Sequence, residues 1–206
     1  NFRCLNRQSQ EISQVSPADA AHYNLSPSQL VELCLEHHCP GIAYTYTEPL
    51  TYLEYIVDTA RLAHAKGLWN ILVTAGYVCQ DPLSDLLPYL DAANIDLKSF
   101  SDDIYYKVSG GHLQPVLDTI LSMQKAGVWI ELTNLVIPDV NDDMTMIRQM
   151  CRWITDNGLA DNPLHFSRFF PRYKMVDIPP TPIQTLKEAK QIAEEEGIKH
   201  VYLGNV

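Results

Sequence analysis

Strand-like runs of β-branched and aromatic residues alternate with amphipathic helical segments along most of this chain. The hydrophobic period switches between about 2 residues in the strands and about 3.6 in the helices. The predicted strands are residues 41–47, 70–76, 92–98, 128–137, 163–169 and 200–205. The predicted helices begin at Ser26-Pro27 and then cover about residues 50–66, 82–90, 101–107, 113–126, 142–157 and 181–196. Such alternation predicts a parallel sheet with helices outside it.

Right-handed crossovers curl a parallel sheet into a barrel, a partial barrel or an open doubly wound sheet. Strand lengths do not separate these three forms. The sequence has no G-x-G-x-x-G and no G-K-[ST] pattern, so the phosphate loops of nucleotide-binding folds are absent. We therefore favour a barrel-like α/β sheet. The length of 206 residues and the 46% hydrophobic content predict a single domain, residues 1–206, with its own core.

Charge and cysteine content narrow the setting of the protein. A net charge of −10 argues against nucleic acid and anionic membranes as partners. No apolar run is long enough to span a bilayer, and no signal-peptide pattern opens the chain. The five cysteines are odd in number and scattered, which argues against a disulfide framework and for a reducing, cytoplasmic setting. The first residue, Asn1, is not Met, so we expect the sequence to begin inside a longer gene product.

Glu48 follows the first predicted strand and precedes Pro49, where the strand must stop. In parallel α/β folds, ligands meet the carboxyl ends of the strands, and Glu48 is expected at such an end. The alternative is that Glu48 caps the next helix, because acidic residues favour the first helical turn.

The strand 92–98 separates polar from apolar side chains by parity. Ala93, Ile95 and Leu97 form an apolar row that should face the helices. Asn94, Asp96 and Lys98 should then point to the concave side of the sheet. Three polar groups in a row are costly to bury unless they are paired or hydrated, which favours a binding site. The alternative is an ion pair between Asp96 and Lys98, or a Lys98 that reaches solvent at the rim.

Other strands repeat polar groups near the same edge. Thr74 stands just before Gly76, where a turn lets backbone approach a ligand, while Asn134 and His165 lie within otherwise apolar strands. A lone strand histidine is more often a satisfied core residue than a ligand. Together with Glu48, Asp96 and Lys98, these residues predict a site for a zwitterionic ligand. Glu48 would bind an ammonium group, and Lys98 or His165 a carboxylate.

Lys98 also admits a different class of function. A lysine at a strand end serves as the Schiff-base amine in aldolase-type barrels, with Asp96 assisting here. That role needs a lowered lysine pKa, which a neighbouring carboxylate opposes.

Six segments in chain order resemble radical S-adenosylmethionine enzymes, more narrowly the pyruvate formate-lyase activating enzyme-like branch in the group named AmmeMemoRadiSam. They are NFRCLNRQSQEIS (1–13), YTYTEP (44–49), VTAGY (73–77), NIDLK (94–98), ELTNLVIP (131–138) and HFSRF (165–169). The resemblance implies a partial (β/α)6 TIM-like barrel that lacks its first strand here, in a chain truncated at both ends. It also implies an oxidoreductase-type, metal-binding enzyme.

The resemblance implies two cofactors, a [4Fe–4S] cluster and S-adenosylmethionine. In that family three cysteines spaced C-x3-C-x2-C hold three irons, and the fourth iron receives the amino and carboxylate groups of S-adenosylmethionine. Reductive cleavage then yields a deoxyadenosyl radical. Cys4 matches the second cysteine, the first would precede Asn1, and the third falls at Arg7, which cannot ligate iron. We therefore expect this chain, as it stands, to hold no stable cluster.

The matching positions imply which residues contact S-adenosylmethionine. Glu48, with Tyr46 and Thr47, would approach the methionine amino group. Asp96, Lys98 and His165 would make further contacts, with Thr74 and Asn134 beside them. The implied partner is a protein substrate such as a glycyl radical enzyme. The alternative is a non-catalytic barrel remnant that binds S-adenosylmethionine or a protein partner.

Overall fold

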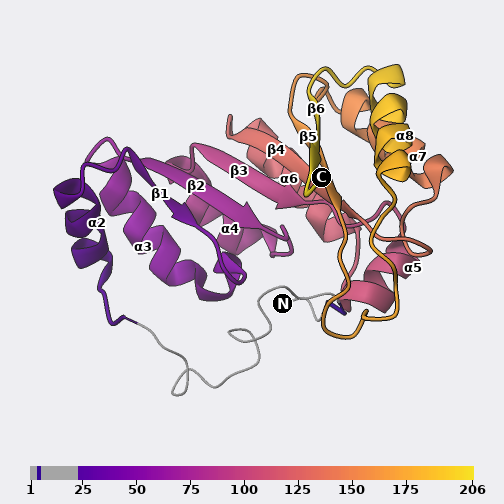
Figure 1. Ribbon diagram of the computed structural model, residues 1–206. Helices are drawn as coiled ribbons and strands as arrows, with labels where there is room; N and C mark the ends of the chain where they lie inside the picture. Colours follow the sequence, from indigo (N-terminus) through magenta and orange to yellow (C-terminus); the bar gives the residue numbers. More distant parts are fainter. Residues whose placement is uncertain (1–3, 6–22) are drawn as a thin grey trace.

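The computed structural model describes residues 4–5 and 23–206. Its centre is one six-stranded sheet in which the strands follow chain order and every neighbouring pair is parallel. The strands are β1 (Gly41–Tyr44), β2 (Trp69–Thr74), β3 (Ala92–Asp96), β4 (Trp129–Val136), β5 (Leu164–Arg168) and β6 (Val201–Gly204). Figure 1 shows them running in this order from β1 at the left to β6 at the upper right. β1 and β6 are the edges, so the sheet is a partial barrel, as predicted.

Helical segments precede the first strand and connect successive strands, as the alternation predicts. They are α2 (Pro27–Glu36), η1 (Pro49–Tyr52), α3 (Leu53–His64), α4 (Gln80–Leu86), η2 (Leu87–Tyr89), α5 (Asp102–Ile104), η3 (Tyr105–Ser109), α6 (Gln114–Lys125), α7 (Met144–Asp156) and α8 (Ile183–Glu195). The predicted start of the first helix is confirmed, because Ser26 Oγ accepts the Gln29 N–H and Gln29 Oε1 accepts the Ser26 N–H. No helix in residues 23–206 is long and apolar enough to cross a membrane.

One face of the sheet, which we call the helix face, carries the hydrophobic core. Ala93, Ile95 and Leu97 are at most 2% exposed and belong to a cluster that includes residues of α3, α6, α7 and α8. The strand parity predicted for 92–98 is therefore confirmed. The matching rows of β2, β4 and β5 are also buried, since successive strand residues alternate between faces.

The opposite face, which we call the open face, is more exposed. Val73, Trp129 and Tyr202 on this face are 40%, 51% and 52% exposed. Its remaining side chains on the central strands are mostly polar, and parallel register places them side by side. They include Asn94, Asp96, Glu131, Thr133, His165 and Ser167. Any ligand of this sheet would meet the open face or the carboxyl edge, because the core closes the helix face.

The first strand is shorter than predicted. β1 ends at Tyr44, and residues 45–48 form a turn that leads into η1. The turn includes a cis peptide bond between Tyr46 and Thr47. Tyr46 and Thr47 are exposed, while Glu48 is partly buried at the end of the turn.

Candidate functional site at the carboxyl edge

Glu48 lies at the carboxyl edge of the sheet and accepts three hydrogen bonds. Its carboxylate caps η1 through the Leu50 N–H at 3.2 Å. It also accepts from the Thr74 hydroxyl at 2.6 Å and from the Ala75 N–H at 2.8 Å. The capping alternative is therefore correct, and the carboxylate is also tied to the end of β2. A carboxylate offers about four acceptor positions, so one is left for a ligand.

Thr74 donates a hydrogen bond to Glu48 and does not lie on the open face. It is 4% exposed and lies on the helix face, paired in register with the buried Ile95. Its oxygen also accepts the Gly76 N–H at 3.0 Å. Gly76 has a φ of +67°, and a Cβ there would lie 2.9 Å from Ile95 Cγ2. Packing against β3 and the left-handed backbone therefore account for this glycine without a ligand.

Asp96 and Lys98 form an ion pair, which was the alternative to a binding site in the sequence analysis. Lys98 Nζ lies 2.7 Å from Asp96 Oδ2, and the two side chains are 27% and 43% exposed. Burial lowers the pKa of the Lys98 ammonium, but the Asp96 carboxylate outweighs burial and raises this pKa above its ordinary value. A protonated lysine is a poor nucleophile, so the Schiff-base role loses its chemical basis.

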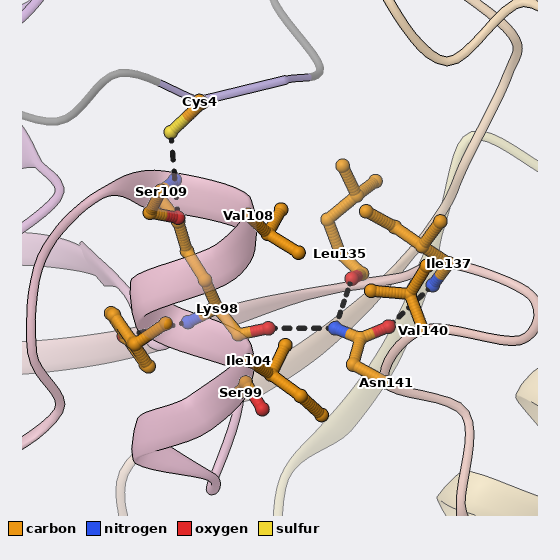
Figure 2. A pocket seen from close by; sticks show the side chains of 11 residues that line it. Cys4, Lys98, Ser99, Ile104, Val108, Ser109, Leu135, Ile137, Val140 and Asn141 are labelled. Atoms are coloured by element: carbon orange, nitrogen blue, oxygen red, sulfur yellow. Dashed lines mark hydrogen bonds between the residues drawn. The ribbon is translucent and has the colours of Figure 1, made fainter.

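Cys4 and Lys98 line the same small cavity beside the end of β3 (Figure 2). The chain segment of Cys4 is held by the Leu5 N–H, which donates to the Val108 carbonyl at 2.9 Å. Cys4 Sγ lies 3.6 Å from Ser109 Oγ. The cavity measures about 50 Å³, room for a few water molecules rather than a nucleoside. A thiol and an ammonium thus meet at the carboxyl edge.

His165 lies on the open face and is held from two sides. Its Nε2 lies 2.8 Å from Glu131 Oε2 of the neighbouring strand. Its ring stacks on Tyr202 of β6, with centroids 5.3 Å apart and an angle of 25° between the planes. His165 is therefore neither a core residue nor an isolated ligand, because a carboxylate and an aromatic ring already orient it.

Asn134 corrects the predicted arrangement, which grouped it with the other rim residues. It is 2% exposed and lies on the helix face, in the row of Ile130 and Leu132. Its Nδ2 donates to the Leu97 carbonyl at 2.7 Å, and its Oδ1 has no partner among the described residues. The physical reason is parity, since Asn134 is an even number of positions from buried Leu132.

Sequence reasoning missed three groups that support the site. Glu131 orients His165, and Thr133 donates to Asn94 Oδ1 at 2.9 Å on the open face. Asn141, in the loop after β4, donates to the backbone carbonyl of Lys98 at 2.6 Å (Figure 2). Parity applied to strand 128–137 would have found Glu131 and Thr133. No sequence pattern indicates Asn141, because its bond depends on the path of a loop.

The predicted residues therefore fall into separate groups. Asp96, Lys98 and Cys4 come together, and His165 lies two strands away with Glu131. Glu48 and Thr74 form a third group at the ends of β1 and β2. Tyr46 and Thr47 lie in the exposed turn before Glu48, and Asn134 faces away.

Comparison with known proteins identifies a family and relatives that match most or all of the chain. The Radical SAM superfamily model matches residues 4–151. The uncharacterized protein MJ0808 of Methanocaldococcus jannaschii is 45% identical over all 206 residues, which span 61% of its length. The pyruvate formate-lyase 1-activating enzyme of Escherichia coli K12 is 25% identical over 176 residues, covering 79% of this chain and 71% of the enzyme.

Two solved structures share the fold at low sequence identity. A domain of pyruvate-formate lyase-activating enzyme from Bacteroides vulgatus is 16% identical with a TM-score of 0.67, covering 80% of this chain and 99% of that domain. SuiB of Streptococcus suis, bound to S-adenosylmethionine, is 10% identical with a TM-score of 0.70, covering 91% of this chain and 45% of SuiB. Likeness at these identities concerns the fold alone.

Proposed function

Since this chain belongs to the Radical SAM superfamily, we propose that it is the core of an enzyme of the pyruvate formate-lyase activating type. The superfamily is one of enzymes that use a [4Fe–4S] cluster and S-adenosylmethionine. When bound together, these groups supply a deoxyadenosyl radical that takes hydrogen from a substrate. The observation that carries the proposal is the meeting of Cys4, Asp96 and Lys98 at the carboxyl edge.

The residues at this edge fit S-adenosylmethionine, a zwitterionic cation. Glu48 keeps one acceptor position for the ammonium group, and its other positions hold it in place. Lys98 stays charged beside Asp96, so the pair offers both a donor and acceptors. Because the cavity at Cys4 is small, the nucleoside would lie on the open face beside it.

The residues present do not by themselves fit a [4Fe–4S] cluster. In the described ranges 4–5 and 23–206, no three His, Cys, Asp or Glu side chains gather as metal ligands. Cys4 supplies one thiolate, and the position expected for another is Arg7, outside the described residues. Three thiolates are needed to leave one iron open for a ligand. That this chain holds no stable cluster is therefore a prediction of the proposal, and cluster reconstitution tests it.

The first test is a calorimetric titration of the iron-free protein with S-adenosylmethionine. We expect the wild-type chain to bind, and Asp96→Asn and Lys98→Met to weaken binding by about tenfold or more. Lys199→Met is the matched control, because Lys199 pairs with Asp161 in an exposed ion pair before β6, at the other end of the strands. Binding that is absent, or unchanged in both site variants, would contradict the proposal.

The second test restores the cluster ligands. A variant with Arg7→Cys and one cysteine added before Asn1 should bind iron and sulfide, show the visible absorbance of a cluster and form deoxyadenosine under reduction. The unaltered chain should do neither. A full cluster on the unaltered chain would refute the ligand assignment of Cys4 and position 7.

A second candidate function is a non-catalytic remnant that binds S-adenosylmethionine or a protein partner. Arg7, at a position where a cluster cysteine is expected, favours it. Tight binding without iron, combined with no deoxyadenosine from the restored variant, would support this candidate over the enzyme.

The substrate and setting follow from the same proposal. The names of the activating-enzyme relatives support a protein substrate such as a glycyl radical enzyme. No disulfide joins the five cysteines, all of which are among the described residues, and this suits a reducing, cytoplasmic setting.

A further inference from the structure

Glu131, His165 and Tyr202 form a connected group on three neighbouring strands of the open face. Glu131 Oε2 and His165 Nε2 are 2.8 Å apart, with side chains 37% and 29% exposed. Tyr202 pairs in register with His165 and stacks on its ring. The imidazole is thus fixed in position, while ligands still have access to the face on which it lies.

The bond to Glu131 determines which ring nitrogen carries the proton. An ionised carboxylate only accepts hydrogen bonds, whereas a neutral imidazole has one donor and one acceptor nitrogen. In the neutral imidazole Nε2 therefore carries the hydrogen, and Nδ1 keeps a lone pair. Among the described residues, no hydrogen bond to Nδ1 occurs. Nδ1 is then an acceptor, available to a donor from outside the chain.

We propose that Glu131 is a positioning residue that fixes the Nε2–H tautomer of His165, so that the ligand group facing this histidine is a hydrogen-bond donor. A hydroxyl or an amine meets this requirement, and a carboxylate does not. The negative charge of Glu131 beside the ring further disfavours a second carboxylate. This revises the sequence-based assignment of His165 to a carboxylate. The proposal rests on the proposed function for the identity of the ligand.

The tautomer is tested on the ligand-free protein with ¹⁵N-labelled histidine by NMR at mildly alkaline pH. We expect His165 to show a protonated Nε2 and an unprotonated Nδ1. In Glu131→Ala the two nitrogen shifts should move toward the averaged values of free imidazole. A protonated Nδ1 in the wild type, or shifts unchanged in Glu131→Ala, would overturn the proposal. Thr133→Ala, which changes the residue paired in register with His165 on the same face, is the control for general disturbance.

The ligand group is tested with S-adenosylmethionine and its carboxamide analogue, which lacks the carboxylate charge. Replacing the carboxylate should weaken binding by the same factor in the wild type and in His165→Ala. If replacing the carboxylate weakens binding to the wild type but not to His165→Ala, then His165 contacts the carboxylate. That result would overturn the inference. If S-adenosylmethionine does not bind at all, the proposed function fails, and the NMR result still decides the role of Glu131.

Discussion

Polar residues have different partners and different exposure on the two faces of the sheet. On the helix face, Asn70 is fully buried, and its side chain accepts from the Tyr44 hydroxyl and donates to the carbonyls of Ala60 and Tyr89. On the open face, polar side chains pair with each other across strands, as Glu131 does with His165. The first arrangement ties a polar group into the fold. The second leaves it next to solvent.

Alternate residues of one strand lie on the two faces, so neighbouring residues should contribute to different properties, stability on one face and binding on the other. A buried polar group must be satisfied by the fold, because an unpaired one costs about 1–3 kcal/mol. A partly exposed pair contributes about 0–1 kcal/mol, since water competes for both partners. Substitutions on the helix face should therefore act on stability, and those on the open face on ligand binding.

The largest expected effect contrasts two adjacent residues of β4. Leu132, 1% exposed on the helix face, contacts the core, and Leu132→Ala should lower the free energy of unfolding by about 2–5 kcal/mol. Thr133→Ala removes one bond to Asn94 on the open face and should cost about 1 kcal/mol or less. Urea denaturation of both variants measures the contrast. Equal losses would show that the open face is packed as tightly as the core.

A finer contrast uses the two buried asparagines of the helix face. Asn70→Ala leaves the Tyr44 hydroxyl and two carbonyls unpaired and should cost about 2–3 kcal/mol. Asn134→Ala removes one bond to Leu97 but also an oxygen without a described partner, so its cost should stay within about 1 kcal/mol. The same denaturation experiment decides between them. A greater loss of unfolding free energy in Asn134→Ala than in Asn70→Ala would mean that the Asn134 oxygen makes a stabilising hydrogen bond.

Sequence patterns predicted the architecture well, because each element carries its own signal. The alternation of strands and helices indicated the parallel sheet, and Ser26 with Pro27 marked the first helix. Parity in the strand 92–98 assigned Asn94, Asp96 and Lys98 to the open side correctly. These predictions depend on residues close together in the chain, where local physics is decisive.

The site was less predictable, because its contacts join residues far apart. Glu48 meets Ala75 across 27 positions, and Glu131 meets His165 across 34. Such pairs depend on strand register and loop paths, which the hydrophobic pattern does not determine. Asn134 was misplaced for a simpler reason: its polarity was weighed without its parity.

The effect that is smallest at neutral pH, and grows only at alkaline pH, concerns Cys151 on α7, which is fully buried in the core behind the helix face. Burial raises the pKa of its thiol from an ordinary value of 9.0 to about 12. The unfolded chain therefore ionises this thiol from about pH 9, whereas the folded chain does so only near pH 12. Stability is fully present below pH 9 and is lost as the pH rises toward 12, by about 1.4 kcal/mol per pH unit.

Cys151→Ala should flatten this alkaline decline, although the variant also loses packing at every pH. Urea denaturation at pH 8, 9 and 10 separates the two effects, because only the slope with pH reports the thiol. Cys79→Ser, at an exposed position, is the control and should leave the slope unchanged. If the free energy of unfolding falls with pH equally in the wild type and in Cys151→Ala, the pKa of this thiol is not raised. Water would then reach the thiol in the core.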